Sequence, residues 1–386
     1  MRNICIVIGS RAHYSSIKSV LSEVKKSANL NLQLITTGSA VLDRYGNVAN
    51  LIQSDGFKIQ ASVNALVEGE TLTTMAKSAG LGVIELSSIF ENIKPDIVLT
   101  VGDRYETMAT VISAAYMNIV LAHTMGGEVT GTIDESIRHA ITKFAHIHFP
   151  ASKEAATRIE RLGEDPSNIH LVGCPRIDLV KQIIINNQEE ARIRDNEIFS
   201  EGVGPSFDLT KPFLLLSQHP VTTEYGHAEE QINQTLAAIE ELEIPTIALW
   251  PNSDAGSEDI SRGMRKLREK KKDINIHFYK NLPVNTYIRL MMKTACLVGN
   301  SSSAIREGPF IGTPAVNIGT RQNKRERGMN VLDVSYSKDE IKEAIIKQIN
   351  HGSYESDHTY GDGTAAEKIV KILESSNPNI QKTITY

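Results

Sequence analysis

The chain begins with Met1-Arg2-Asn3-Ile4-Cys5-Ile6-Val7-Ile8-Gly9-Ser10-Arg11, and this stretch decides the expected fold class. Its short apolar run, rich in Ile and Val, is typical of a strand that is buried on both faces of a parallel sheet. The run is too short for a signal peptide and is not followed by a small-residue cleavage site. We therefore interpret it as the first strand of an α/β protein.

The same arrangement recurs along the chain, because short apolar runs alternate with longer amphipathic segments. Strands are expected at residues 4–8, 32–36, 97–101, 119–121, 169–172, 213–216, 246–250, 274–278, 295–298 and 315–318. Helices are expected at residues 16–27, 71–93, 105–117, 135–145, 229–242 and 258–271. Such alternation predicts doubly wound parallel sheets joined by right-handed crossovers.

The length of the chain and one break in this alternation predict two domains. At roughly 150 residues per domain, 386 residues suggest two. Residues 186–212 are polar and include Gly202, Gly204 and Pro205, which indicates a linker. We expect Rossmann-like domains at 1–190 and 212–362, a linker at 191–211, and a helix and tail at 363–386 that could pack on either domain. Two such domains facing each other would have a cleft at the carboxyl ends of both sheets.

The composition excludes several classes of partner and site. The net charge is −5 and the basic residues are scattered, so no nucleic-acid partner is expected. No apolar stretch approaches the roughly 20 residues that cross a bilayer, so no membrane partner is expected. Cys5, Cys174 and Cys296 are far apart, which predicts reduced thiols in a cytoplasmic protein. His146-Ile147-His148 has no third ligand nearby, and we expect a structural role for it rather than a metal site.

In the first half of the chain, charged residues follow the expected strands. Gly9-Ser10-Arg11 would bring backbone N–H groups and a guanidinium to an anion, although many α/β domains have a glycine at this place. Asp103, in Gly102-Asp103-Arg104, either points from a strand end into the cleft or caps the next helix.

The densest group of ionisable residues lies between His123 and His139. Three glycines allow a ligand to approach the backbone closely, and Glu128, Asp134, Glu135 and Arg138 lie around them. Asp134 could be a plain helix cap, but packing does not explain so many charges in a glycine-rich loop. We interpret this loop as part of a site.

The second half of the chain has the features of a nucleotide site. Gly299-Asn300-Ser301-Ser302, between a strand and a helix, is typical of a phosphate cradle. Glu307, one to two turns into that helix, could accept hydrogen bonds from a ribose or could be a surface residue. His219, after another strand, can donate to a phosphate or transfer a proton. No G-x-G-x-x-G follows a strand, which excludes a dinucleotide dehydrogenase. A sugar-nucleotide enzyme fits this combination.

These loops resemble the hydrolysing UDP-N-acetylglucosamine 2-epimerases, which include bacterial sialic and legionaminic acid pathway enzymes and the epimerase half of the animal bifunctional epimerase/kinase. The resemblance rests on Gly102-Asp103-Arg104, on the run from Gly126 to His139, and on the segments 218–223, 251–257, 299–302 and 319–322. It implies a glycosyltransferase-B-type fold and conversion of UDP-N-acetylglucosamine and water to N-acetylmannosamine and UDP. The implied path is elimination of UDP and then addition of water with inversion at C2. It also implies a homo-oligomer, a dimer or tetramer, and no nicotinamide or metal cofactor.

The resemblance also implies roles for individual residues. The expected catalytic residues are Asp103, Glu128, Asp134 and His219. The expected substrate and UDP contacts are Arg11, Ser15, Arg104, Arg138, Asn252, Asp254, Ser301, Ser302, Glu307 and Arg321. Because an exposed Asp is a weak base, with a pKa near ~3.9, we hypothesise that desolvation and carboxylate crowding raise the pKa of one of these carboxyls.

Two positions depart from the family's pattern. Met125 stands where many relatives have a Glu that is thought catalytic, and a thioether cannot transfer a proton. His13 stands where relatives often have Asp, and it bears on substrate choice, since one branch of the family acts on diacetamido-trideoxy sugar nucleotides. The alternatives are therefore that substrate, a non-hydrolysing epimerase, a glycosyltransferase, and a sugar-nucleotide-binding regulator that has lost catalysis.

Overall fold

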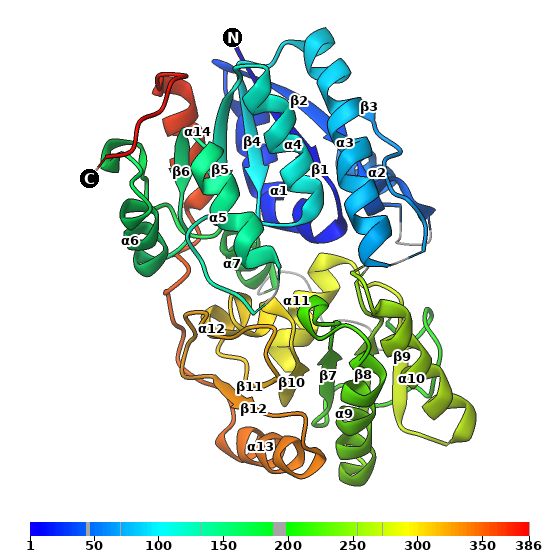
Figure 1. Ribbon diagram of the computed structural model, residues 1–386. Helices are drawn as coiled ribbons and strands as arrows, with labels where there is room; N and C mark the ends of the chain where they lie inside the picture. The colour runs from blue at the N-terminus through cyan, green and yellow to red at the C-terminus, as the bar shows by residue number, and fades with distance from the viewer. Residues whose placement is uncertain are drawn as a thin grey trace. The chain divides into compact units, whose positions relative to one another are not determined.

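The computed structural model describes residues 1–43, 47–69, 71–131, 133–187, 198–252, 254–271 and 273–385. The chain divides into two compact units (Figure 1). The first unit comprises Met1–Glu128, Ile133–Leu179 and Thr359–Tyr386, and the second comprises Val129–Thr132 and Val180–His358. Each unit contains a six-stranded sheet in which all strand pairs are parallel. Both units are therefore Rossmann-like, which confirms the expected fold class.

The sheet of the first unit has the strand order β3-β2-β1-β4-β5-β6. Its strands are β1 (Arg2–Ile8), β2 (Leu30–Thr36), β3 (Ile59–Ser62), β4 (Ile97–Val101), β5 (Val120–Thr124) and β6 (Ile147–Phe149). Its helices are α1 (Arg11–Lys26), α2 (Val48–Ser54), α3 (Leu72–Ile93), α4 (Tyr105–Tyr116), α5 (Asp134–Phe144), α6 (Lys153–Arg161) and α14 (Ala365–Ser375), while α7 (Pro175–Asn187) passes from the first unit to the second. Right-handed crossovers place α3, α4 and α5 on one face and α1 on the other, as Figure 1 shows.

The second sheet has the order β12-β11-β10-β7-β8-β9. In both sheets the strand order therefore reverses next to the first strand of the unit, which is β1 in the first sheet and β7 in the second. Its strands are β7 (Leu214–Ser217), β8 (Thr246–Leu249), β9 (Ile276–Tyr279), β10 (Cys296–Gly299), β11 (Ala315–Ile318) and β12 (Val331–Val334). Its helices are α9 (Ala228–Leu242), α10 (Ser257–Lys270), α11 (Val284–Lys293), α12 (Glu307–Ile311) and α13 (Lys338–His351). The loops at the carboxyl ends beside each reversal are where open α/β sheets bind ligands.

Each unit has its own apolar core between its sheet and its helices. Cys5, Val98 and Leu121 lie in the core of the first unit, and Leu216 and Val298 lie in that of the second. All three cysteines are buried thiols. Among the described residues, no helix is long and apolar enough to cross a membrane.

The structure corrects several expected boundaries. Residues 169–172 do not form a strand, because only Ile169 pairs, in an isolated bridge with His148. Strand β5 continues to Thr124, so His123 belongs to the strand and not to the loop. Residues 191–197 of the expected linker lie outside the described residues. Further along that segment, Val203 bonds in both directions to Phe278 of β9, at 2.9 and 2.8 Å, so it packs on the second unit.

The C-terminal segment packs on the first unit. The carboxylate of Asp178 accepts hydrogen bonds from the N–H groups of Ala365 and Ala366 (3.0 and 2.6 Å) and so caps α14. His146 and His148 also make structural contacts, with Ile380 O (3.0 Å) and with the carboxylate of Glu164 (3.1 Å).

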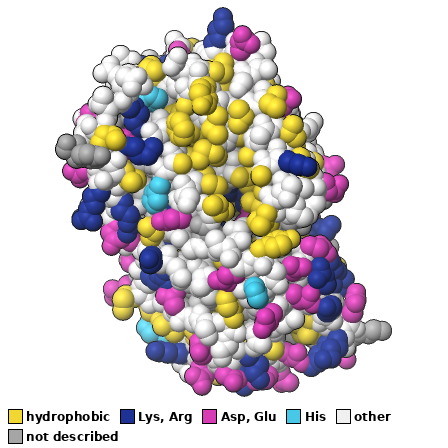
Figure 2. Space-filling view, in the orientation of Figure 1, with side chains coloured by type: hydrophobic (Ala, Val, Ile, Leu, Met, Phe, Trp, Pro, Cys, Tyr) yellow, Lys and Arg dark blue, Asp and Glu magenta, His cyan; other side chains and the backbone are white. Residues whose placement is uncertain are grey.

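Hydrophobic side chains gather on the face of the first unit that α3, α4 and α5 form (Figure 2). Leu81 and Ile84 of α3 and Tyr116 of α4 are exposed there. Exposed apolar patches often mark interaction surfaces. The expected homo-oligomer stays a prediction.

Candidate functional site

In the first unit, the expected catalytic residues gather around one buried arginine. Arg138, in the second turn of α5, has no exposed surface. Its guanidinium donates to Asp103, to Glu135 (3.1 Å) and to the backbone O of Glu128 (2.9 Å). Burial alone would lower the pKa of Arg138, but Asp103 and Glu128 raise it above its ordinary value. The guanidinium therefore stays charged and fixes the loops after β4 and β5 to α5.

The structure distinguishes the two interpretations of Asp103. The N-cap residue of α4 is Arg104, not Asp103, and no side chain caps that helix. The carboxylate of Asp103 pairs with Arg138 instead. Asp134 is the first residue of α5, after the N-cap residue Ile133, and its charge acts on Arg138. Glu128 is 2% exposed in the same group.

His123 connects the loops after β4 and β5. Its Nε2 lies 2.9 Å from the carbonyl oxygen of Gly102. A Cβ on Gly126 would lie 2.8 Å from its Nδ1, so this glycine lets the loop fold directly against the ring. Burial lowers the pKa of His123 to about 4, although the hydrogen bond to Gly102 opposes the shift. The ring is therefore a neutral donor that holds the turn before Asp103.

Met125 is a packing residue in an unusual backbone conformation. Its φ of 61° is left-handed, which is uncommon for a residue with a side chain. Only 5% of its surface is exposed, and its Sδ lies 3.7 Å from the Sγ of Cys174. A thioether cannot transfer a proton, so Met125 supplies no acid or base to this unit.

The other expected contacts of the first unit lie at two helix starts. Arg11 is the first residue of α1, whose N-cap residue Ser10 accepts a hydrogen bond from the N–H of His13 (3.2 Å). The hydroxyl of Ser15 donates to Arg11 O at 2.9 Å, within the same helix. Arg104 pairs with Glu106, with 3.1 Å between Nε and Oε2. Glu106 was not among the expected site residues, and sequence spacing gives no sign of it.

In the second unit, Asn300 holds four loops together. Its side-chain oxygen accepts from His219 N (2.8 Å) and its amide donates to His219 O (2.9 Å). The ring of His219 in turn accepts from Asn252 N at 3.1 Å. The carbonyl oxygen of Asn300 accepts from Arg321 (3.2 Å) and Gln322 (2.9 Å). Asn300 thus connects the loops after β7, β8, β10 and β11, although only its place in the Gly-Asn-Ser-Ser motif pointed to it.

The structure brings Arg321, Asn252 and Asp254 together. Arg321 lies 3.9 Å from the carboxylate of Asp254, which also accepts from the amide of Asn252. Glu224 was missed, and it braces the loop of Arg321 by accepting from Thr320 and from Tyr336 (2.9 Å). Gly131 donates from its backbone to Arg321 O at 3.1 Å.

The serine loop after β10 differs from the expectation in one respect. Ser301 caps a short 3-10 turn, Ser302–Ala304. Glu307 is then the first residue of α12, a five-residue helix, and not one to two turns into a longer helix. Pro309 explains this, because it has no N–H to bond to the carbonyl of Ile305. Glu307 has no exposed surface, so the interpretation of it as a surface residue is wrong.

Two buried histidines predict that the protein loses stability in mild acid. Burial lowers the pKa of His13 and of His123 to about 4, whereas a histidine in the unfolded chain titrates near ~6.5. Between these values the unfolded chain binds protons that the folded protein does not. The free energy of unfolding is therefore unaffected by these rings above about pH 6.5. It falls by about 3 kcal/mol for each ring as the pH drops toward 4.

Urea unfolding at several pH values between 7.5 and 4.5 tests this prediction. His123→Phe should unfold with a smaller pH dependence than the wild type. His227→Phe is a matched control, because the side chain of His227 is 68% exposed, and its pH dependence should equal that of the wild type. A His123→Phe protein with the wild-type slope would contradict the assignment.

Comparisons with known proteins show the family and the fold of this chain. Residues 22–374 match the family model described as UDP-N-acetylglucosamine 2-epimerase. A UDP-N,N'-diacetylbacillosamine 2-epimerase (hydrolyzing) of Legionella pneumophila is 32% identical over 97% of this chain and 96% of its own. A UDP-N-acetylglucosamine 2-epimerase of Neisseria meningitidis is 29% identical over 99% of this chain and 98% of its own. The Methanocaldococcus jannaschii UDP-GlcNAc 2-epimerase, solved with UDP-GlcNAc and UDP, has a TM-score of 0.80 at 17% identity and covers 97% of this chain and 100% of its own, and so has the same fold.

Proposed function

The chain belongs to the UDP-N-acetylglucosamine 2-epimerase family, and from this premise we propose that it converts UDP-N-acetylglucosamine and water to N-acetylmannosamine and UDP, for sialic acid-type sugar synthesis. One observation carries the proposal, namely the group formed by Asp103, Glu128 and Asp134 around the buried Arg138. Epimerisation at C2 needs a base for one face of the sugar and an acid for the other. This group supplies several carboxylates and holds them in place.

In the proposed reaction, a carboxylate removes the C2 proton of the sugar. The C1–O bond then breaks, UDP leaves with the bonding electrons, and a C1=C2 double bond forms. A carboxylic acid returns a proton to C2 from the opposite face while water adds at C1 and gives one proton to the carboxylate so formed. The proton first removed from C2 leaves with UDP or passes to the solvent. The atoms balance as UDP-N-acetylglucosamine plus water giving N-acetylmannosamine plus UDP. Asp103 and Asp134 are the proposed acid–base pair, and Glu128 is a further proton-transfer group.

The second unit is proposed to bind the nucleotide. Its loops offer hydroxyls from Ser301 and Ser302, the imidazole of His219, and the guanidinium of Arg321. Arginine and backbone N–H groups at strand ends suit phosphates. Glu307 would accept hydrogen bonds from the ribose hydroxyls. Positive donors near the diphosphate stabilise the charge that develops as UDP leaves.

A second candidate substrate is UDP-2,4-diacetamido-2,4,6-trideoxyglucose, which would undergo the same reaction. The names of two relatives favour it, because the Legionella pneumophila and Campylobacter jejuni proteins are described as hydrolysing diacetylbacillosamine 2-epimerases.

Incubation with each sugar nucleotide in deuterated water tests the proposal. NMR should show free UDP together with a 2-epimerised sugar that carries deuterium at C2. Product that keeps UDP would instead identify a non-hydrolysing epimerase, and UDP binding without turnover of either substrate would identify a binding protein. If UDP binds without turnover, the variant Met125→Glu separates a binding protein from an enzyme that Met125 has inactivated. Turnover gained by this variant would show that Met125 had blocked catalysis.

A further inference from the structure

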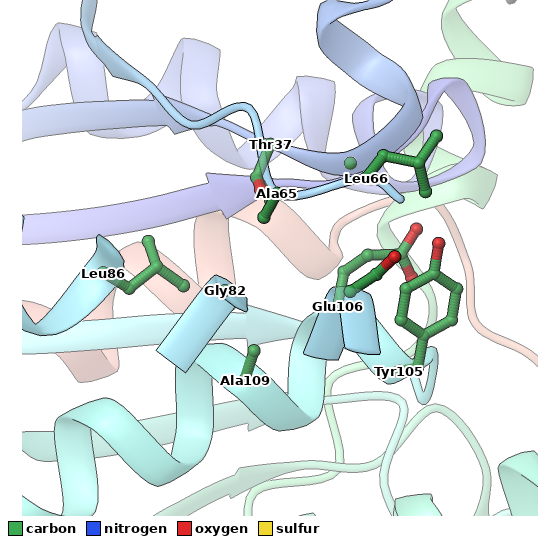
Figure 3. A pocket seen from close by; sticks show the side chains of 10 residues that line it. Thr37, Ala65, Leu66, Gly82, Leu86, Tyr105, Glu106 and Ala109 are labelled. Carbon is green, nitrogen blue, oxygen red and sulfur yellow. The ribbon is translucent and has the colours of Figure 1, made fainter. Parts of the chain in front are cut away.

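Two helices follow the loops that carry the expected catalytic residues, and they are held in place differently. Helix α4 packs closely on α3, since a Cβ added to Gly82 would lie 2.9 Å from the Cβ of Ala109. Figure 3 shows these two residues beside Leu86. The buried residues of α5, by contrast, are Arg138, Ile141 and Thr142. Only one of them is apolar, whereas α4 buries several apolar side chains, so apolar packing holds α5 less strongly than α4.

Polar contacts hold both ends of α5 instead. Near its start, Arg138 binds the loop after β4. At its far end, the ammonium of Lys382, from the C-terminal segment, lies among the last carbonyl oxygens of the helix. Its Nζ donates to Thr142 O (3.4 Å), to Lys143 O (2.9 Å) and to Ala145 O. The last carbonyls of an α-helix have no partner within the helix, and a cation there also complements the helix dipole.

A buried carboxylate fixes this ammonium. Glu164, which follows α6, is 2% exposed. It pairs with Lys382 (2.5 Å), with Lys143 (2.5 Å) and with His148 of β6 (3.1 Å). Burial alone would raise the pKa of Glu164, but the hydrogen bonds from these three side chains lower it to about 2. The carboxylate therefore stays charged, and it joins α5, β6 and the C-terminal segment at one point.

The C-terminal segment is held there by polar contacts rather than by the core. After α14, residues 376–385 contribute no buried side chain. Their backbone is tied down at two further places, because Ile380 O accepts from His146 Nε2 (3.0 Å) and Thr385 N donates to Gly163 O (3.0 Å). A segment that buries no side chain adds little to the stability of the core. Loss of its contact with α5 should therefore leave the fold intact.

Two connections carry the position of this anchor to the proposed acid–base group. Helix α5 has 11 residues and is about 16 Å long, so its first residue, Asp134, moves with its far end. Thr142 gives a shorter connection, because its hydroxyl donates to Arg138 O at 3.0 Å. The same hydroxyl would lie 3.2 Å from a Cβ on Gly126, in the turn that leads to Glu128. A shift at the end of α5 would therefore displace the groups around the buried guanidinium.

We propose that Lys382 is a positioning residue for the reaction, because its ammonium fixes the C-terminal end of α5 and thereby holds Asp134 and Arg138 where proton transfer needs them. The assignment rests on the proposed function for the roles of those two residues. A misplacement of about 1 Å can lower a rate by about a hundredfold even when the mutation lies far from the chemistry. The anchor therefore acts on turnover from the opposite end of the helix.

Kinetics of Lys382→Met test this role, because the variant keeps a long side chain but removes the charge and its donors. It should lower kcat by roughly tenfold to a hundredfold and leave KM and the affinity for UDP nearly unchanged, since only the geometry of proton transfer is altered. The variant should fold, because Glu164 keeps Lys143 and His148 as partners and is not left as an unpaired buried charge. Urea unfolding checks this point.

Two further variants separate positioning from a merely structural role. Lys382→Arg keeps a positive charge and N–H donors at the helix end, so it should retain most of the wild-type kcat. Lys368→Met is the matched control, because Lys368 lies in α14 with its side chain 46% exposed, and it should keep the wild-type rate. Wild-type kcat in Lys382→Met, a loss of UDP affinity by the same factor as kcat, or a kcat of Lys382→Arg as low as that of Lys382→Met would overturn the proposal.

NMR of protein labelled with 15N in its arginine side chains tests the anchor without a substrate. The Nε–H resonance of Arg138 should shift in Lys382→Met and keep its wild-type position in Lys368→Met. An unchanged Arg138 resonance in Lys382→Met would also overturn the proposal. Because this measurement needs no sugar nucleotide, it gives an answer even if the protein turns over neither candidate substrate, so the anchor and the proposed function can fail separately.

Discussion

Asp134→Asn is expected to lower turnover by a factor of roughly 10² to 10⁴, the usual contribution of a general acid or base. Asp134 begins α5 and its charge acts on Arg138, beside Asp103. Asn has nearly the same shape but cannot accept or return the C2 proton. The helix should survive, because a favourable charge at a helix start contributes only about 0.3–1 kcal/mol. The affinity for UDP should stay nearly unchanged, because the proposed nucleotide contacts belong to the second unit.

Steady-state release of UDP and calorimetric binding of UDP measure the two effects separately. Glu154→Gln is the matched control, since Glu154 lies in the first turn of α6 and its side chain is 58% exposed. It should keep the wild-type rate. Normal turnover by Asp134→Asn would remove Asp134 from the mechanism, and equal losses of turnover and UDP affinity would indicate a structural role instead.

The sequence was informative about the strands that lie at the centre of each sheet. Strands β1, β4, β7 and β10 have runs of Ile, Val and Leu because both of their faces are buried, and such runs are recognisable without a structure. Every motif assigned to the site follows one of the parallel strands, and the carboxyl ends of parallel strands meet at one edge. The sequence therefore indicated that Asp103 and Arg138 lie close together in the first unit, and that His219 and Arg321 lie close together in the second.

Three of the four outer strands could not be recognised from their residues, whereas the fourth, β9, was expected at 274–278. Strands β3, β6 and β12 have the sequences IQAS, IHF and VLDV, which are shorter or more polar than the runs of the inner strands. Such sequences also occur in loops, and what makes them strands is a neighbouring strand. Residues 169–172 show the reverse, since they are apolar but only Ile169 finds a pairing partner.

The pairing of charges was also beyond the sequence. Asp103 and Arg138 are 35 residues apart, and Glu135 or Glu128 would have been equally plausible partners from spacing alone. Glu106 was missed, and the bridging role of Asn300 was not foreseen from its motif, because each acts through long-range contacts, with the glycine turn at Gly38 and with the backbone of His219. Residue type identifies the chemistry that is available, but only the fold decides which groups meet.

Gly299→Ala is expected to disable the second unit, because the residue lies where three strands of its sheet end. It pairs with Ser217 of β7 and Asn317 of β11, and its φ of +125° is open almost only to glycine. A Cβ there would lie 2.3 Å from Ser217 O, the atom that accepts the hydrogen bond of Asn300 N at 3.1 Å. Backbone strain of about 1–3 kcal/mol and overpacking of about 1–3 kcal/mol should together lower the free energy of unfolding.

The same clash should weaken UDP binding at least tenfold, since Asn300 cannot then hold His219 and Arg321 in their present places. Urea unfolding and UDP calorimetry measure the two losses. Gly352→Ala is the matched control, because Gly352 also has a positive φ (+76°) but its Cβ would meet no described atom within 4 Å. It should show backbone strain alone and wild-type UDP affinity. If Gly299→Ala binds UDP as tightly as Gly352→Ala does, the loops around Asn300 are not the nucleotide site, and the assignment of His219 and Arg321 to UDP fails with them.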